Sequence, residues 1–145
     1  MEKAPLKLTY QVSLRAESET DYTLIKTTDQ LWNITGKDAF PHFSGNIKYK
    51  TELTISKPGG YILDLGRVGE AVRLYVNDRY AGYQLTPPYR FDLDGFLKPG
   101  KNKLSIIVSN TNAYARRDEL SQYLQLEPSG LLGEVSLERY EIQTP

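Results

Sequence analysis

Apolar and polar side chains alternate along much of this chain, and this alternation constrains the fold more than any other feature. In one segment Val72, Leu74 and Val76 alternate with Arg73 and Tyr75. Because successive side chains of a β-strand point to opposite faces of a sheet, such a segment predicts a strand with one buried face. Strands are predicted in this way at 6–14, 49–55, 61–65, 72–76, 80–85, 104–108 and 134–142, with further candidates at 22–26 and 89–93.

Turn-forming residues separate these segments. The sequence Asn77-Asp78-Arg79 predicts a tight hairpin turn, because Asn and Asp tolerate a positive φ. Helical periodicity is confined to one short candidate at 117–126. Many short strands without helix-length crossovers predict one all-β domain over residues 1–145, folded as an antiparallel sandwich.

The composition excludes several kinds of chemistry. The chain has no Cys, so it forms no disulfide, thiolate–zinc site or iron–sulfur cluster, and it has no Cys nucleophile. Its single His excludes a site built from several histidines, and no cofactor is expected. With 18 basic and 18 acidic residues, neither nucleic acid nor a membrane surface is an expected partner. No segment approaches the roughly 20 apolar residues of a membrane span.

The first residues lack the apolar region of a signal peptide. The chain is therefore either not exported or a piece of a longer protein. The sequence leaves its compartment open.

Two isolated residues invite a functional interpretation, but a structural one is favoured for both. His42 lies between Phe40 and Phe43, and the chain has no nucleophile elbow that such a histidine would serve as a base. Trp32 is expected to anchor the core in preference to forming an exposed stacking platform. Neither residue is assigned to catalysis.

Asp92 and Asp94 place two carboxylates on one side of an extended segment, about 7 Å apart at their Cα atoms. That spacing is compatible with glycoside hydrolysis, which uses paired carboxylates. A turn at Asp94-Gly95 is the favoured interpretation, because nothing nearby in the sequence supplies a pocket. The same two carboxylates form a weak candidate calcium site, although their spacing matches no EF-hand loop.

The most polar segment, 110–118, directly follows a predicted apolar strand. Amide, aromatic and guanidinium groups together are typical of recognition surfaces. Two interpretations of this segment are equally compatible with its sequence. It is either a loop that contacts sugar hydroxyls or docks on another domain, or a solvated loop with an Arg–Asp pair. The candidate contact residues are Asn110, Asn112, Tyr114, Arg116, Arg117 and Asp118.

An ordered series of short motifs resembles a known family. The series is similar to the sugar-binding-like, galactose-binding-like jelly-roll domain of glycoside hydrolase family 2, and of related bacterial β-galactosidase-type and α-L-rhamnosidase-type hydrolases. It covers residues 31–142, and residues 1–15 before it are expected to be an extra strand or the tail of a preceding domain. The motifs are 43–49, 63–72, 76–82, 87–93, 97–104, 108–111 and 129–135.

The resemblance implies an antiparallel jelly-roll β-sandwich and limits its function. In such hydrolases the catalytic carboxylates lie on a separate barrel domain, so this chain is expected to be non-catalytic and ancillary. Segment 110–118 matches the loop that reaches the substrate pocket, and carbohydrate or the catalytic domain is the expected partner. The alternatives are an autonomous carbohydrate-binding module and a purely structural spacer. A parent enzyme of this type is compatible with export or a periplasmic location.

Overall fold

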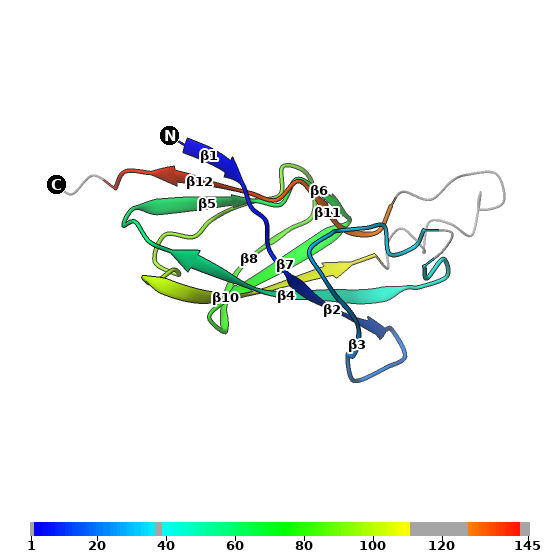
Figure 1. The fold of residues 1–145 in the computed structure, drawn as a ribbon. Coiled ribbons are helices and arrows are strands. Elements are labelled where there is room, and N and C mark those ends of the chain that lie inside the picture. The colour runs from blue at the N-terminus through cyan, green and yellow to red at the C-terminus, as the bar shows by residue number, and fades with distance from the viewer. Residues whose placement is uncertain (1, 37–38, 111–127, 143–145) are drawn as a thin grey trace.

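The alternating segments form the strands of two antiparallel sheets that pack face to face (Figure 1). The computed structural model describes residues 2–36, 39–110 and 128–142. The six-stranded sheet has the order β3-β2-β4-β10-β7-β8. Its strands are β2 (Tyr10–Ala16), β3 (Thr23–Thr28), β4 (Gly45–Ile55), β7 (Ala71–Val76), β8 (Arg79–Gln84) and β10 (Gly100–Ser109).

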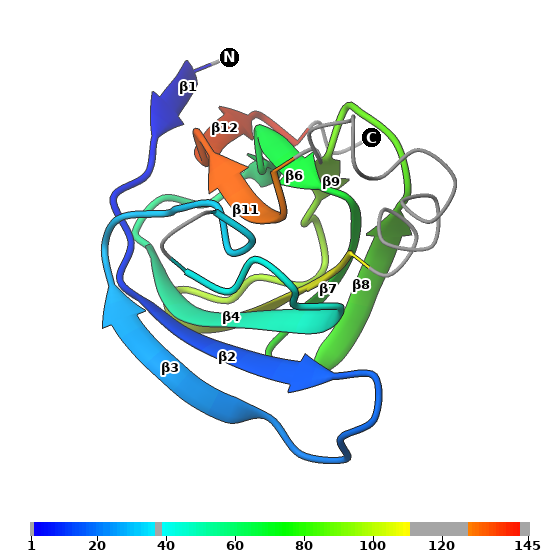
Figure 2. The ribbon, with the colours of Figure 1, turned by 90° about the vertical axis from the view of Figure 1, so that its right-hand side faces the viewer.

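The opposing four-stranded sheet has the order β1-β12-β5-β9. A third, two-stranded ladder pairs β6 with β11 and continues the β5–β12 pair toward one end of the sandwich (Figures 1 and 2). This architecture confirms the predicted all-β jelly-roll sandwich. The four-stranded sheet consists of β1 (Glu2–Pro5), β5 (Gly60–Asp64), β9 (Arg90–Asp92) and β12 (Ser136–Tyr140). The two-stranded ladder consists of β6 (Arg67–Gly69) and β11 (Gly130–Gly133).

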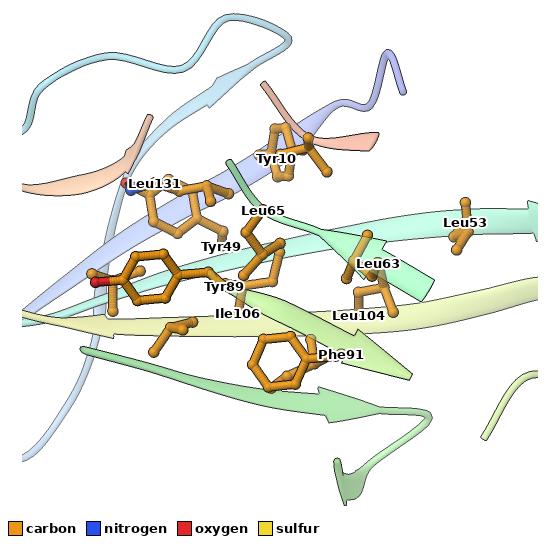
Figure 3. Close-up of a cluster of buried hydrophobic side chains, with 14 of the residues drawn as sticks. Tyr10, Tyr49, Leu53, Leu63, Leu65, Tyr89, Phe91, Leu104, Ile106 and Leu131 are labelled. Atoms are coloured by element: carbon orange, nitrogen blue, oxygen red, sulfur yellow. Dashed lines mark hydrogen bonds between the residues drawn. The ribbon is translucent and has the colours of Figure 1, made fainter. Parts of the chain in front are cut away.

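The core lies between the sheets and is formed by the inward residues of each alternation (Figure 3). The rings of Tyr10 and Tyr49 meet edge to face, with their centroids 6.1 Å apart. The Tyr49 hydroxyl accepts a hydrogen bond from the Leu131 N–H at 2.9 Å, which ties β11 to β4. Burial raises the pKa of Tyr10 to about 12 and raises the pKa of Tyr49 further. Both tyrosines therefore act as core residues, and Tyr49 also uses its hydroxyl to bind a neighbouring strand.

The predicted hairpin at Asn77-Asp78 is confirmed. Asn77 and Asp78 have φ values of 50° and 67°, the left-handed conformation that a two-residue hairpin turn requires. The Asn77 side chain also donates to the Asn102 amide oxygen at 2.9 Å and accepts from the Lys103 N–H at 2.9 Å. The turn is thus bound to the start of β10.

The prediction of one strand over 6–14 is wrong in its start, because the strand begins at Tyr10. β1 belongs to the four-stranded sheet and β2 to the six-stranded sheet, and residues 6–9 carry the chain between them. Leu6 and Leu8 nevertheless pack against the core, and the Leu6 N–H donates to the Val135 carbonyl at 2.9 Å. The alternation of apolar and polar residues continues through 6–9 because it follows which side chains are buried. It does not depend on whether the backbone is hydrogen-bonded to a neighbouring strand.

The segment after Gly66 contains a short strand, β6, which is not among the strands predicted from the sequence. Gly66 has a φ of 69°, and a Cβ there would collide with the backbone of Gly133. A glycine is therefore needed at this close approach. The predicted helix at 117–126 lies outside the described residues. Within the described ranges, no helix is long and apolar enough to cross a membrane.

Candidate functional site

Asn110 begins the predicted contact segment and lies fully buried at the end of β10. Its amide oxygen accepts the Gly45 N–H at 2.9 Å, and its amide nitrogen donates to the Phe43 carbonyl at 3.0 Å and the Ser129 hydroxyl at 3.2 Å. Because these groups are engaged inside the protein, the side chain offers no exposed atom to a ligand. In the structure Asn110 positions the chain at this end of the sandwich.

Asn33 extends the same hydrogen-bonded network. Its amide oxygen accepts the Ser129 N–H at 2.8 Å and the Thr35 N–H at 3.1 Å, and the Ile34 N–H donates to the Ser129 carbonyl at 3.0 Å. Asn110 and Ser129, on either side of segment 111–127, are thus held together and bound to the Asn33 loop. The other predicted contact residues, Asn112, Tyr114, Arg116, Arg117 and Asp118, lie outside the described residues.

Trp32 and His42 lie on the loops that approach this network. Trp32 is partly buried against the core, and the Lys26 ammonium lies 5.0 Å from its ring centroid. His42 is exposed in a turn that the Phe43 N–H closes by donating to the Phe40 carbonyl at 3.0 Å. The structure therefore places Trp32 at the edge of the core and His42 in a surface turn.

Asp92 and Asp94 form the predicted turn at the end of β9. Asp92 accepts the Asp94 N–H at 3.0 Å, which is the hydrogen bond of an Asx turn. The Tyr140 hydroxyl lies 2.7 Å and 2.9 Å from the two Asp92 oxygens. This hydrogen bond, with burial and the nearby charges adding to it, raises the pKa of Tyr140 to about 12.

The weak calcium site at Asp92 and Asp94 stays a prediction. In the described part of the chain, no three His, Asp or Glu side chains lie close enough together to hold a metal ion.

The outer face of the six-stranded sheet is a second polar surface, which the sequence interpretation missed. Its residues line a groove of about 610 Å³ that crosses β2, β4 and β10. Most of the polar side chains there are outward members of alternating strands, so the sequence contains part of the signal. Which outward residues stand beside one another depends on strand register, which the sequence does not state. The groove includes Thr9, Gln11, Thr27, Lys50, Glu52, Lys103 and Ser105.

Comparisons with known proteins identify the fold. No protein-family model matches the chain. A putative β-glucuronidase from Formosa agariphila is 29% identical over an 84-residue alignment that covers 54% of this chain and 7% of that protein. A rhamnosidase structure from Novosphingobium sp. PP1Y superposes on 94% of this chain with a TM-score of 0.72 at 23% identity. A GH2 β-galacturonidase from Eisenbergiella tayi superposes on 95% with a TM-score of 0.71 at 17% identity.

The expected resemblance to sandwich domains of these hydrolases is confirmed at the level of fold. The chain nevertheless spans only a small part of each of these proteins: 7% of the curated relative, and 15% and 24% of the two solved chains. It aligns as one domain-sized portion of large glycoside hydrolases.

Proposed function

We propose that this chain is a non-catalytic, ancillary β-sandwich domain of a larger glycoside hydrolase. One observation carries the proposal: nearly the whole chain superposes on a small portion of hydrolases that act on different sugars by name. A fold shared by a rhamnosidase and a β-galacturonidase is compatible with a scaffold role, since neither sugar is specific to it. Activity and substrate then belong to the rest of such an enzyme.

The described carboxylates also support a non-catalytic role. Glycoside hydrolases generally place two carboxyl groups on either side of the scissile bond. Asp92 is engaged by the Tyr140 hydroxyl and by the Asp94 N–H, so it serves a turn and a sheet contact. Asp94 is exposed beside it.

The sandwich end at Asn110 is the part of the domain that we assign to the substrate pocket or to the catalytic domain. Asn110 and Ser129 hold the two ends of segment 111–127 close to each other. In this proposal Asn112, Tyr114, Arg116, Arg117 and Asp118 supply the contacts, and Asn110 positions them. An autonomous carbohydrate-binding module is the second candidate, supported by the exposed rings of Tyr80 and Tyr83.

Two experiments test the ancillary role. The chain alone, assayed with nitrophenyl rhamnoside, galacturonide, glucuronide and galactoside, is expected to hydrolyse none of them, and turnover of any one would overturn the proposal. In the complete hydrolase, Arg116→Ala with Arg117→Ala is expected to lower kcat/KM about tenfold. Lys57→Ala, an exposed site away from that end, is the control. Unchanged kinetics and unchanged thermal stability in the double variant would leave a spacer role.

A further inference from the structure

The outer face of the six-stranded sheet carries an excess of basic side chains, although Asp78 and Glu52 also line its groove and the whole chain has a formal net charge of zero. Among the outward positions of β2, β4, β10 and β7, one residue, Glu52, is acidic and six are basic. Within the described ranges, none of these six forms an ion pair with a carboxylate. A positive potential is therefore expected over this face. The six basic residues are Arg15, Lys48, Lys50, Arg73, Lys101 and Lys103.

Strand register arranges this face into two continuous rows of side chains that cross all six strands. Neighbouring strands lie about 4.8 Å apart, so each row is roughly 24 Å long, enough for several sugar rings. The first row is Thr27, Gln11, Lys50, Ser105, Tyr75 and Tyr80. The second is Leu24, Ser13, Lys48, Ile107, Arg73 and Tyr83.

The kind of side chain in the two rows changes from β2 to β8. Toward β2 the first row runs along the groove of about 610 Å³, which falls in the size range of ligand sites. Toward β8 both rows end in tyrosines. Tyr80 and Tyr83 are 55% and 50% exposed, and the Tyr80 ring centroid lies 5.6 Å from that of Tyr75. The face therefore combines hydroxyl, amide and ammonium groups with an aromatic platform.

The cations on this face are close enough to affect one another. Lys48 lies 4.0 Å from the Tyr22 ring centroid, and Arg15 lies 5.3 Å from the same ring. Burial lowers the pKa of Lys48, and the charges of Lys50 and Arg15 lower it further. An anionic ligand would relieve this repulsion.

We propose that this face binds an acidic oligosaccharide, whose carboxylates contact Lys50, Lys103 and Arg73. Its sugar rings lie along the rows and stack on Tyr80 and Tyr83. Charge complementarity selects an anionic occupant. A protein partner is disfavoured, because the cores of protein interfaces are depleted in Lys, and Lys7, Lys50 and Lys103 line this groove. This site is separate from the Asn110 end, and the inference does not depend on the ancillary role.

The test is calorimetric titration of the chain with tetragalacturonate, and with its methyl ester, which has the same rings but no charge. The acid is expected to bind at least tenfold more tightly than the ester, and higher salt is expected to weaken it. Equal binding of the two, or no binding of the acid, would overturn the proposal. Stronger binding of a single-stranded oligonucleotide at the same salt would also overturn it, by assigning the face to nucleic acid.

Variants locate the site. Lys50→Gln with Lys103→Gln, and separately Tyr80→Ala with Tyr83→Ala, are each expected to weaken binding at least tenfold. Lys57→Ala with Lys98→Ala removes the same charge outside the groove and outside both rows, and is expected to change binding less than twofold. Tyr80→Phe with Tyr83→Phe keeps the rings and is expected to retain most of the affinity. Circular dichroism establishes that each variant is folded. Losses as large in the Lys57 and Lys98 variant would contradict the assignment.

Discussion

The two outer faces of the sandwich differ in whether their basic side chains are paired with carboxylates. On the four-stranded sheet, Lys3 and Arg90 lie 3.3 Å and 3.8 Å from Asp64, and Arg90 also lies 2.7 Å from Glu138. On the six-stranded sheet, basic side chains lie beside one another, and Glu52 is the single acidic residue among the outward positions of β2, β4, β7 and β10. One face neutralises its charges internally, and the other leaves them available to a ligand.

This difference shows why a net charge near zero is a poor guide to partners. The balanced total first argues against any electrostatic recognition, yet it averages over a face whose charges are paired and a face with a basic excess. Exposed ion pairs contribute only about 0.2–1 kcal/mol each, so the paired face gains modest stability from its network. On the six-stranded face, neighbouring Lys and Arg side chains repel one another, which costs a small amount of stability. That cost is consistent with a binding role.

The largest expected contrast between the faces involves tyrosine. The Tyr140 ring lies across Gly60, at a place where a Cβ would collide with it, and its hydroxyl binds Asp92. Tyr140→Ala loses both the packing and the hydrogen bond, and is expected to lower the free energy of unfolding by about 2 kcal/mol. Tyr80→Ala, on the other face, is expected to lower it by no more than about 0.5 kcal/mol. Urea denaturation of both variants measures the two changes in the free energy of unfolding. Equal decreases would contradict the expected contrast between the faces.

The Tyr140 hydroxyl gives a smaller, pH-dependent effect. Tyr140→Phe is expected to lower the free energy of unfolding by about 1 kcal/mol near neutral pH. The pKa of Tyr140 is raised from 10 to about 12, so the folded state favours the protonated phenol. The advantage of the wild type is present below pH 10 and is lost as the pH rises toward 12. Urea titrations of both proteins across this range measure it, and a constant difference would contradict the hydrogen bond's role.

The smallest effects are expected to have opposite signs on the two faces. Lys50→Gln relieves the repulsion that acts on Lys48, and is expected to raise the free energy of unfolding by about 0.3 kcal/mol at low salt. Arg90→Gln breaks its contacts with Asp64 and Glu138, and is expected to lower it by about 0.5 kcal/mol. Molar salt should shrink both differences. If both variants were destabilised equally, the two faces would not differ as described.

The sequence predicts the long strands well, because their inward residues alternate over enough positions to be counted. β6 and β11 are missed because strands of three and four residues carry too little periodicity to recognise. Their pairing depends on a close approach between Gly66 and Gly133, which are distant in sequence. The alternation at 6–14 misleads in a different way, since it continues while the chain crosses between sheets.

The site is less predictable than the fold. A polar residue after an apolar strand suggests an exposed contact, yet Asn110 is buried by Gly45, Phe43 and Ser129, which are 65, 67 and 19 residues away. Only the folded chain brings these partners together. The abundance of tyrosine likewise has no single meaning. Tyr10 and Tyr49 fill the core, whereas Tyr80 is exposed at the end of a row.

The Asn110–Ser129 contact also bears on how this sandwich tolerates change. Among the described residues, the hydrogen bonds at this end join Asn110 and Ser129 to Gly45, Phe43 and Asn33. A segment of different length or composition can therefore be exchanged between the same two residues while these bonds stay intact. In engineering terms, the sandwich offers a graft point where a new recognition loop can be installed on an unchanged frame.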